Sequence, residues 1–154
     1  VIGHARQLGI PVLVDPKGRD YGKYRGATAL TPNKRETAEA CRVDVHDSAV
    51  LLEAAARMRQ DLQLDFLAVT RGEEGVSLIE DDHSLHIPAT ARQVFDVSGA
   101  GDTVIAAAFL CLVGGASYYD AASLANYAAG VVVGKVGTAT CKPKELIEYI
   151  GEDA

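Results

Sequence analysis

The chain has 154 residues, 48% of them hydrophobic, and a formal net charge of −6. This length is enough for one ordinary domain with a hydrophobic core. The thinly spread basic residues argue against nucleic acid as the main partner, and no run approaches the roughly 20 apolar residues that a membrane span needs. The three cysteines, Cys41, Cys111 and Cys141, form no close pair, which favours a reducing cytoplasm over a disulfide scaffold.

The first predicted elements are a helix over residues 1–8 and a buried strand over residues 10–14. The helix has neither a starting Met nor an evident cap, so we expect the chain to begin inside a helix and to be a fragment. The strand is a continuous apolar run typical of a parallel sheet. It is followed by Asp15 and Lys17, at the end of a strand where open α/β sheets bind ligands. Lys17 is therefore a candidate contact for a phosphate or sugar phosphate, with a solvated loop lysine as the alternative.

A second short strand is predicted over residues 27–31, and a helix starts after Asn33. Glu36 lies three residues after Asn33, which is the spacing of a capping box. In such a box each side chain accepts a hydrogen bond from the backbone N–H of the other residue, and this structural role explains the pair locally. A functional role is compatible with it, because a glutamate at a helix N-terminus near a phosphate can organise Mg²⁺ through water.

The middle of the chain is predicted to be scaffold. A long amphipathic helix begins at Asp47 and Ser48, and its apolar residues recur on one face. A buried strand over residues 65–70 comes next, followed by a tight turn into residues 76–79 and a hairpin into residues 84–87.

Residues 96–103, Asp-Val-Ser-Gly-Ala-Gly-Asp-Thr, hold the main candidates for chemistry. We expect them to lie between a short strand at residues 94–95 and a buried helix. Gly99 and Gly101 leave no side chain over the amides at the positive end of the helix dipole, so the turn can hold an anion, phosphate above all. Asp102 repels such an anion, and it suits a base that takes a proton from a hydroxyl attacking phosphorus. In the alternative, it is a first-turn acid favoured by the dipole and the glycines are ordinary turn residues.

A second small-residue helix is predicted over residues 118–134, after Gly114 and Gly115. Asn126 is a lone amide within it, which calls for either a buried partner or a ligand. A loop and a final helix from Pro143 follow, and Lys142 is a poor capping residue that predicts a frayed start. No internal repeat or linker divides the chain, so it is interpreted as one domain.

Three blocks together are far more specific than any one of them. They are residues 15–18 (Asp-Pro-Lys-Gly), 31–36 (Thr-Pro-Asn-Lys-Arg-Glu) and 96–103, and in this order they resemble the ribokinase-like, or PfkB, carbohydrate kinases. The run of residues 15–36, which includes Tyr24-Arg-Gly at 24–26, and residues 126–138 add a similarity to one subgroup, the kinase domain of bifunctional D-glycero-β-D-manno-heptose 7-phosphate kinase / heptose 1-phosphate adenylyltransferase. The resemblance implies an α/β fold, a three-layer α/β/α sandwich with a mostly parallel sheet.

What the resemblance implies for function is ATP-dependent phosphorylation of a sugar phosphate, with Mg²⁺ and a monovalent cation as further cofactors. The substrate would be the heptose 7-phosphate and the product its 1,7-bisphosphate, a precursor of ADP-heptose and the lipopolysaccharide core. Asp102 would be the general base for the anomeric hydroxyl, and the N–H groups of Gly99, Ala100 and Gly101 the anion hole for the γ-phosphoryl group. The remaining positions would be Asn33 and Glu36 at the nucleotide phosphates and Mg²⁺, Thr70 and Gly72 beside the nucleotide, Asn126 on the adenine side, and Asp96 and Ser98 near the cation.

The chain departs from this family in length, since a family kinase domain is about twice as long, as a combined nucleotide and substrate domain requires. Residues 1–154 are therefore expected to be the C-terminal, ATP-side half of such a domain. Two other interpretations stay open: a kinase for another small sugar or a nucleoside, and a non-catalytic nucleotide-binding or oligomerisation module. The sequence does not fix the oligomeric state, and a homo-oligomer is compatible with it.

Overall fold

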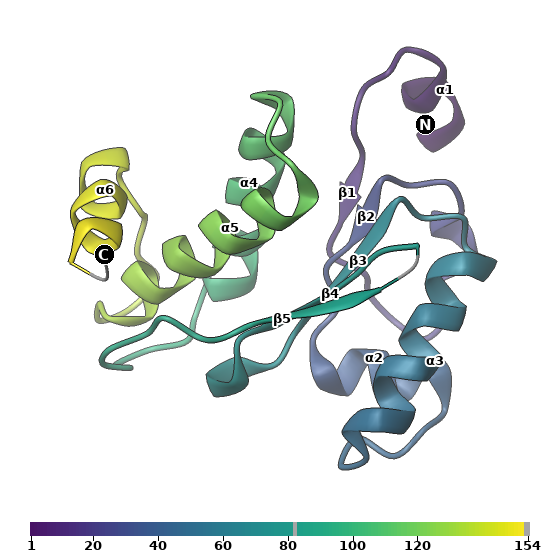
Figure 1. The fold of residues 1–154 in the computed structure, drawn as a ribbon, viewed down its shortest axis with the longest axis horizontal. Coiled ribbons are helices and arrows are strands. Elements are labelled where there is room, and N and C mark those ends of the chain that lie inside the picture. Colours follow the sequence, from purple (N-terminus) through teal and green to yellow (C-terminus); the bar gives the residue numbers. More distant parts are fainter. Residues whose placement is uncertain (82, 153–154) are drawn as a thin grey trace. The chain divides into compact units, whose positions relative to one another are not determined.

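The structure, a computed structural model, describes residues 1–81 and 83–152 (Figure 1). The chain divides into two compact units. The first unit comprises residues 1–71 and 77–86, and the second comprises residues 72–76 and those from residue 87 on. Among the described residues, no helix is both long and apolar enough to cross a membrane.

A five-stranded sheet is built almost entirely from the first unit. Its strands are β1 (Leu13–Val14), β2 (Ala29–Leu30), β3 (Phe66–Thr70), β4 (Val76–Ile79) and β5 (Ser84–Ile87), and they lie side by side in chain order. β1, β2 and β3 run parallel, with Leu13 opposite Ala29 and Leu30 opposite Leu67. The connections from β3 to β4 and from β4 to β5 are too short for a parallel crossover. The sheet is therefore mixed, with a parallel half and a hairpin half.

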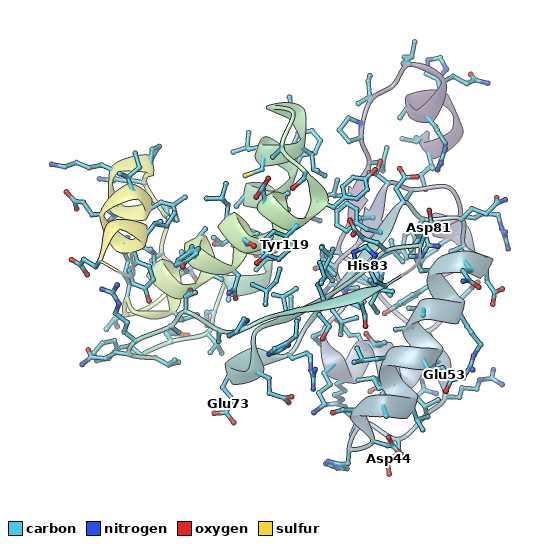
Figure 2. The ribbon with its side chains drawn as sticks, in the orientation of Figure 1. Asp44, Glu53, Glu73, Asp81, His83 and Tyr119 are labelled. Carbon is cyan, nitrogen blue, oxygen red and sulfur yellow. The ribbon has the colours of Figure 1, made fainter. Side chains whose placement is uncertain are left out.

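Helices of the first unit are α1 (Ile2–Gln7), α2 (Lys34–Cys41) and α3 (Ser48–Asp61), and α2 and α3 pack against β3. As predicted, Asp47 caps α3, its carboxylate accepting a hydrogen bond from the Val50 N–H at 3.0 Å. Glu53 projects from the solvent face of α3 (Figure 2). It forms an ion pair with Arg57, 2.6 Å long. The buried core of the unit consists of Tyr21, Ala27, Leu30, Ala55, Leu62, Leu64, Leu67, Val69 and Ile79.

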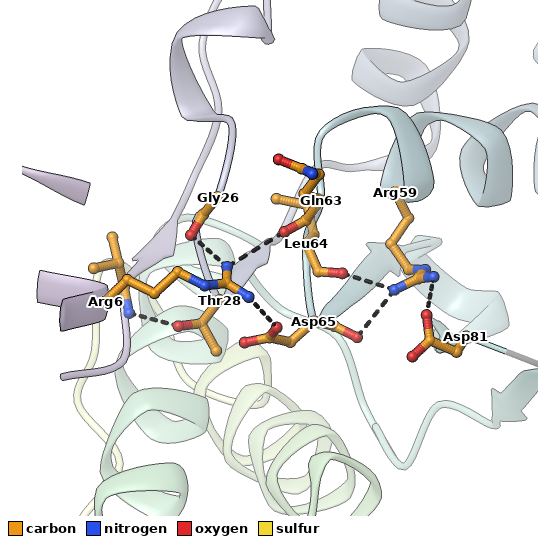
Figure 3. Close-up of polar contacts among 9 residues, drawn as sticks. Arg6, Gly26, Thr28, Arg59, Gln63, Leu64, Asp65 and Asp81 are labelled. Carbon is orange, nitrogen blue, oxygen red and sulfur yellow. Dashed lines mark hydrogen bonds and ion pairs between the residues drawn. The ribbon is translucent and has the colours of Figure 1, made fainter. Parts of the chain in front are cut away.

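Two arginines fasten the helices to the segment that enters β3 (Figure 3). Arg6 of α1 donates to the Gly26 carbonyl at 2.8 Å and pairs with the Asp65 carboxylate at 3.0 Å. Arg59 of α3 is only 5% exposed; it donates to the Leu64 carbonyl at 2.7 Å and pairs with Asp81. A buried guanidinium is tolerated because carbonyl and carboxylate oxygens satisfy its donors.

The second unit is helical. It contains α4 (Ala100–Val113), α5 (Tyr118–Val133) and α6 (Pro143–Gly151), and α5 contacts both of the others. Alanines and Gly130 bring α5 close to its neighbours: a Cβ on Gly130 would lie 2.8 Å from the Thr90 hydroxyl oxygen. The Tyr149 hydroxyl of α6 donates to the Thr90 carbonyl at 2.6 Å. Its ring lies under the Arg92 guanidinium, 4.4 Å from centroid to Cζ.

Three local predictions need correction. Residues 94–95 form no strand: Val94 and Phe95 are largely exposed, and the Phe95 N–H donates to the Val133 carbonyl at the end of α5, 2.8 Å away, instead of to a strand. Helix α4 is not fully buried, since Leu110 is 69% exposed. The start of α6 is not frayed, because the Glu145 carboxylate accepts a hydrogen bond from the Lys142 N–H at 2.8 Å.

Candidate functional site

In the first unit, charged side chains gather where β1 and β2 end. Lys17 follows β1, and its Nζ lies 2.8 Å from an Asp15 carboxylate oxygen and 3.5 Å from one of Glu36. Parallel strands end at the same edge of a sheet, so the segments after β1 and β2 lie near each other and Asp15 and Glu36 both reach Lys17. The Asp15 and Glu36 carboxylates raise the pKa of Lys17 above its ordinary value, the hydrogen bond to Asp15 contributing most. This lysine is thus held as a cation on an exposed edge.

The capping box predicted for Asn33 and Glu36 is present. The Asn33 side chain accepts a hydrogen bond from the Glu36 N–H, and the Glu36 carboxylate accepts one from the Asn33 N–H, both at 2.8 Å. Asn33 also forms an isolated parallel bridge with Thr70 at the end of β3, where the Thr70 N–H donates to the Pro32 carbonyl at 2.9 Å. Four predicted site residues of the first unit, Lys17, Asn33, Glu36 and Thr70, are therefore neighbours.

In the second unit, the glycine turn leads into α4 as predicted. Gly99 is the N-cap residue and has a φ of +79°, a left-handed conformation that costs glycine nothing. The Ala100 N–H donates to the Val97 carbonyl at 3.2 Å, and its part in the anion hole remains a prediction. Gly101 and Asp102 follow in the first turn, where an α-helix offers no carbonyl acceptor for their N–H groups. The Asp102 side chain is exposed.

Asp96 organises the turn before α4. Its carboxylate accepts a hydrogen bond from the Ser98 N–H at 2.9 Å. The Ser98 hydroxyl first, then the Ser98 N–H and the Gly137 N–H, hold the pKa of Asp96 below its ordinary value. Asp96 and Ser98, predicted to lie near a cation, are thus seen to stabilise the turn itself.

The remaining predicted positions also belong to the second unit. Asn126 is 7% exposed, and its side-chain nitrogen donates to the Pro88 carbonyl at 2.7 Å, so it is a satisfied core amide. Gly72, two residues after Thr70, has a φ of +61° and open space at its Cβ position. The nucleotide contacts predicted for Asn126 and Gly72 remain predictions.

The sequence model of the pfkB family of carbohydrate kinases matches residues 2–145. The chain belongs to this family. It is 62% identical over 146 residues to the bifunctional protein HldE of Methylobacillus flagellatus, which covers 95% of this chain and 30% of that protein. With HldE of Magnetococcus marinus the identity is 54% over 155 residues, which cover all of this chain and 32% of the relative. The chain thus spans about a third of the length of these relatives.

Solved structures show that the family fold is present, which confirms the predicted ribokinase-like α/β class. Arabidopsis thaliana ribokinase, complexed with ribose and ATP, has a TM-score of 0.87 at 24% identity, covering 97% of this chain and 50% of its own. Escherichia coli phosphofructokinase-2 in complex with potassium has a TM-score of 0.87 at 18% identity, covering 99% of this chain and 51% of its own. This chain therefore accounts for about half of a PfkB kinase fold.

Sequence reasoning overlooked several residues around these PfkB motifs. Tyr21 is 4% exposed, and its hydroxyl has no hydrogen-bond partner among the described residues. Burial, and secondarily the Glu36 carboxylate, raises the pKa of Tyr21. Lys135 and Glu145 form an ion pair 2.7 Å long. No local pattern signals this pair, because its members come from a loop and from a helix ten residues on.

No group of three or more His, Cys, Asp or Glu side chains within residues 1–81 and 83–152 has the arrangement of a metal site. A Mg²⁺ that travels with a nucleotide needs only one or two carboxylates, because phosphates and waters supply the other ligands. The half-buried carboxylates of Asp15 and Glu36 fit this lesser requirement. In the same part of the chain the three cysteines are free thiols.

Proposed function

We propose that this chain is the ATP-side half of a kinase domain that phosphorylates D-glycero-β-D-manno-heptose 7-phosphate at its anomeric hydroxyl, in the cytoplasm. Family membership supports phosphoryl transfer, and the high identity to HldE proteins supports the heptose substrate. The observation that carries the proposal is the exposed Asp102 in the first turn of α4, beside amide N–H groups that have no helical acceptor.

In this proposal Asp102 takes the proton of the attacking hydroxyl. The hydroxyl oxygen forms a bond to the γ-phosphorus of ATP while the bond from that phosphorus to the bridging oxygen of ADP breaks. The N–H groups of Gly101 and Asp102, with the dipole of α4, stabilise the negative charge spread over the transferring group. Gly99 makes the turn and Ala100 closes it, which refines the roles expected for these two residues.

In the first unit, the proposed roles follow from the charges at the strand ends. Lys17 provides a cation for a phosphate of the nucleotide or of the sugar phosphate, and Asn33 and Thr70 line the nucleotide side. Asp15 and Glu36 would hold Mg²⁺ through water; the ion, when bound, neutralises phosphate charge. In the second unit, Gly72 and Asn126 are proposed beside the nucleotide. Asp96, kept anionic by its hydrogen bonds, would sit with Ser98 near a monovalent cation.

The decisive experiment compares the wild-type protein with Asp102→Asn. Phosphorylation of heptose 7-phosphate is followed by ³¹P NMR, in the 154-residue chain and in a version extended to the length of the HldE relatives. We expect turnover in the extended protein to fall by at least about a hundredfold, the usual worth of a general base, with ATP affinity nearly unchanged. Equal turnover in the wild type and in Asp102→Asn would show that Asp102 is not the general base.

Two alternatives to this function are tested on the same proteins. Solved ribokinases and an adenosine kinase share the fold, so another sugar or a nucleoside is the alternative acceptor, and a substrate screen on the extended protein separates these. The second alternative is a non-catalytic nucleotide-binding module or an oligomerisation module. If the wild type and all variants bind ATP without turnover, a nucleotide-binding module is favoured. If analytical ultracentrifugation shows self-association without turnover, an oligomerisation module is favoured.

A further inference from the structure

The turn before α4 has little packing of its own to hold it in place. Val97, at its centre, is 69% exposed, and Ser98 is exposed as well. Hydrogen bonds connect it to other segments: the Asp96 N–H donates to the Val133 carbonyl at 3.3 Å, and the Gly137 N–H donates to the Asp96 carboxylate. The position of the turn, and of the first turn of α4 after it, therefore depends on the end of α5 and, through Gly137, on the loop of residues 134–140.

Residues 134–140 are themselves a loop without regular structure. They include two glycines, and Val136 is 86% exposed, so the loop is not held by a core of its own. The loop nevertheless lies against the turn: a Cβ on Gly99 would be 3.3 Å from the Thr138 methyl carbon. Some other interaction must restrain this loop.

Lys135 supplies that restraint. Its Nζ donates to the Thr140 carbonyl at 2.8 Å and to the Glu145 carboxylate at 2.7 Å, so one ammonium group joins the start of the loop, its end and α6. Glu145 is fixed in turn at the start of α6, where its carboxylate accepts a hydrogen bond from the Lys142 N–H at 2.8 Å. The side chains of Lys135 and Glu145 are 32% and 36% exposed, so solvent screens this pair less than one on the open surface.

We propose that Lys135 and Glu145 are positioning residues for the phosphate-binding turn, clamping residues 134–140 against residues 96–99 and so fixing the amides and carboxylate at the start of α4. The chemical consequence for phosphoryl transfer rests on the proposed function. The mechanical part, the restraint of the turn, does not.

The mechanical part is tested by residue-resolved amide hydrogen exchange on the 154-residue chain. In Lys135→Met we expect exchange of the Ala100 and Thr103 amides to rise by about tenfold, as a local opening without its anchoring charged hydrogen bonds would allow. Amides of α3 should be unaffected. Lys135→Arg should restore most of the protection, because it keeps the charge and its donors. Lys144→Met is the matched control: Lys144 lies on α6, the helix that carries Glu145, but its side chain is 87% exposed and its pair with Glu148 is longer, at 3.8 Å.

The proposal would be overturned if the Ala100 and Thr103 amides of Lys135→Met exchanged at the same rate as in the wild type. It would also be overturned if exchange rates rose equally throughout the chain. If Lys135→Met does not fold, Glu145→Gln serves instead; it keeps an acceptor for the Lys142 N–H but loses the charge, and we expect a rise of about threefold.

Kinetics on the extended protein separate this proposal from the proposed function. Lys135→Met should lower kcat by about tenfold with little change in KM for ATP, because misplacement of the reacting groups costs turnover more than binding. A wild-type protein without phosphoryl transfer, but with the expected exchange pattern, would refute the proposed function and leave the clamp standing. An active wild type with unchanged exchange and kcat in the variant would refute the clamp.

Discussion

Gly99 and Gly101 differ in what the fold requires of them. Gly99 needs its left-handed backbone, and a side chain there would press on Thr138. Gly101 lies within the first turn of α4, and a Cβ at this position would meet nothing within 4 Å beyond its chain neighbours and the backbone of its own helix. Glycine is a poor helix residue compared with alanine. Stability therefore explains Gly99 but not Gly101, whereas a ligand that approaches the amides closely explains Gly101.

We predict opposite outcomes for alanine at these two positions. Gly99→Ala should lower the free energy of unfolding by about 1–2 kcal/mol, the cost of a left-handed alanine. Gly101→Ala should leave it equal or raise it by up to about 1 kcal/mol, yet weaken ATP-dependent phosphorylation in the extended protein. Urea unfolding and the kinase assay measure the two effects. A Gly101→Ala protein with full activity would show that nothing approaches these amides.

Tyr21 provides a second test at the level of one residue. Its hydroxyl is buried without a partner among the described residues, and an unsatisfied buried hydroxyl costs about 1–3 kcal/mol. Tyr21→Phe removes the hydroxyl and keeps the ring in the core, so we expect urea unfolding to show a gain of about 1 kcal/mol. Tyr24→Phe is the control, because the Tyr24 hydroxyl accepts a hydrogen bond from the Lys17 N–H at 3.4 Å. A loss of stability in Tyr21→Phe would mean that its hydroxyl has a partner in solution.

At the level of elements, local sequence signals predicted the helices well. The strand predicted at residues 94–95 was wrong because its backbone is paired by a long-range contact. The Asn33–Glu36 capping box spans four residues, and sequence spacing was sufficient to find it. The apolar pair at residues 94–95 fits a strand pattern, but the Phe95 N–H finds its acceptor on Val133, 38 residues away, which no local pattern indicates. For the same reason the sequence could name the site residues one by one, but the contacts of Lys17 with Asp15 and Glu36 are visible only in the folded structure.

The start of α6 has a pH dependence that follows from Glu145. The Lys135 ammonium, and secondarily the Lys142 N–H, lowers the pKa of Glu145 below its ordinary value of 4.5. The folded state therefore binds a proton less readily than the unfolded state, so the contribution of Glu145 to stability is present above pH 4.5 and is lost as the pH falls through the folded-state pKa.

We accordingly predict that Glu145→Gln lowers stability at neutral pH, and that the difference from wild type shrinks as the solution is acidified below pH 4.5. Urea unfolding across this range measures the difference. Glu148→Gln is the control, since the Glu148 carboxylate forms a more exposed and longer pair with Lys144, at 3.8 Å. A constant difference at every pH would show that the lost interaction is packing rather than charge.

At the level of the whole molecule, the two units are built from different core residues. The first unit buries large side chains, among them Phe66, Leu30, Leu51 and Leu67, around a sheet. The second joins its helices largely through alanine, glycine and valine. Small side chains bury less apolar area each, and hydrophobic stabilisation scales with that area. The units should therefore differ in local stability.

Leu67→Ala tests whether each unit has a stability of its own. Leu67 is 0% exposed, and truncating a fully buried leucine costs about 2–5 kcal/mol. If the units open separately, native-state hydrogen exchange in this variant should show lost protection in α3 and β3, with α5 nearly unchanged. Leu110→Ala, at a 69% exposed position of α4, should leave the exchange protection of both units unchanged. An equal loss in α3 and α5 of Leu67→Ala would instead show that the chain unfolds as a single cooperative body, with the helical second unit drawing its stability from the sheet.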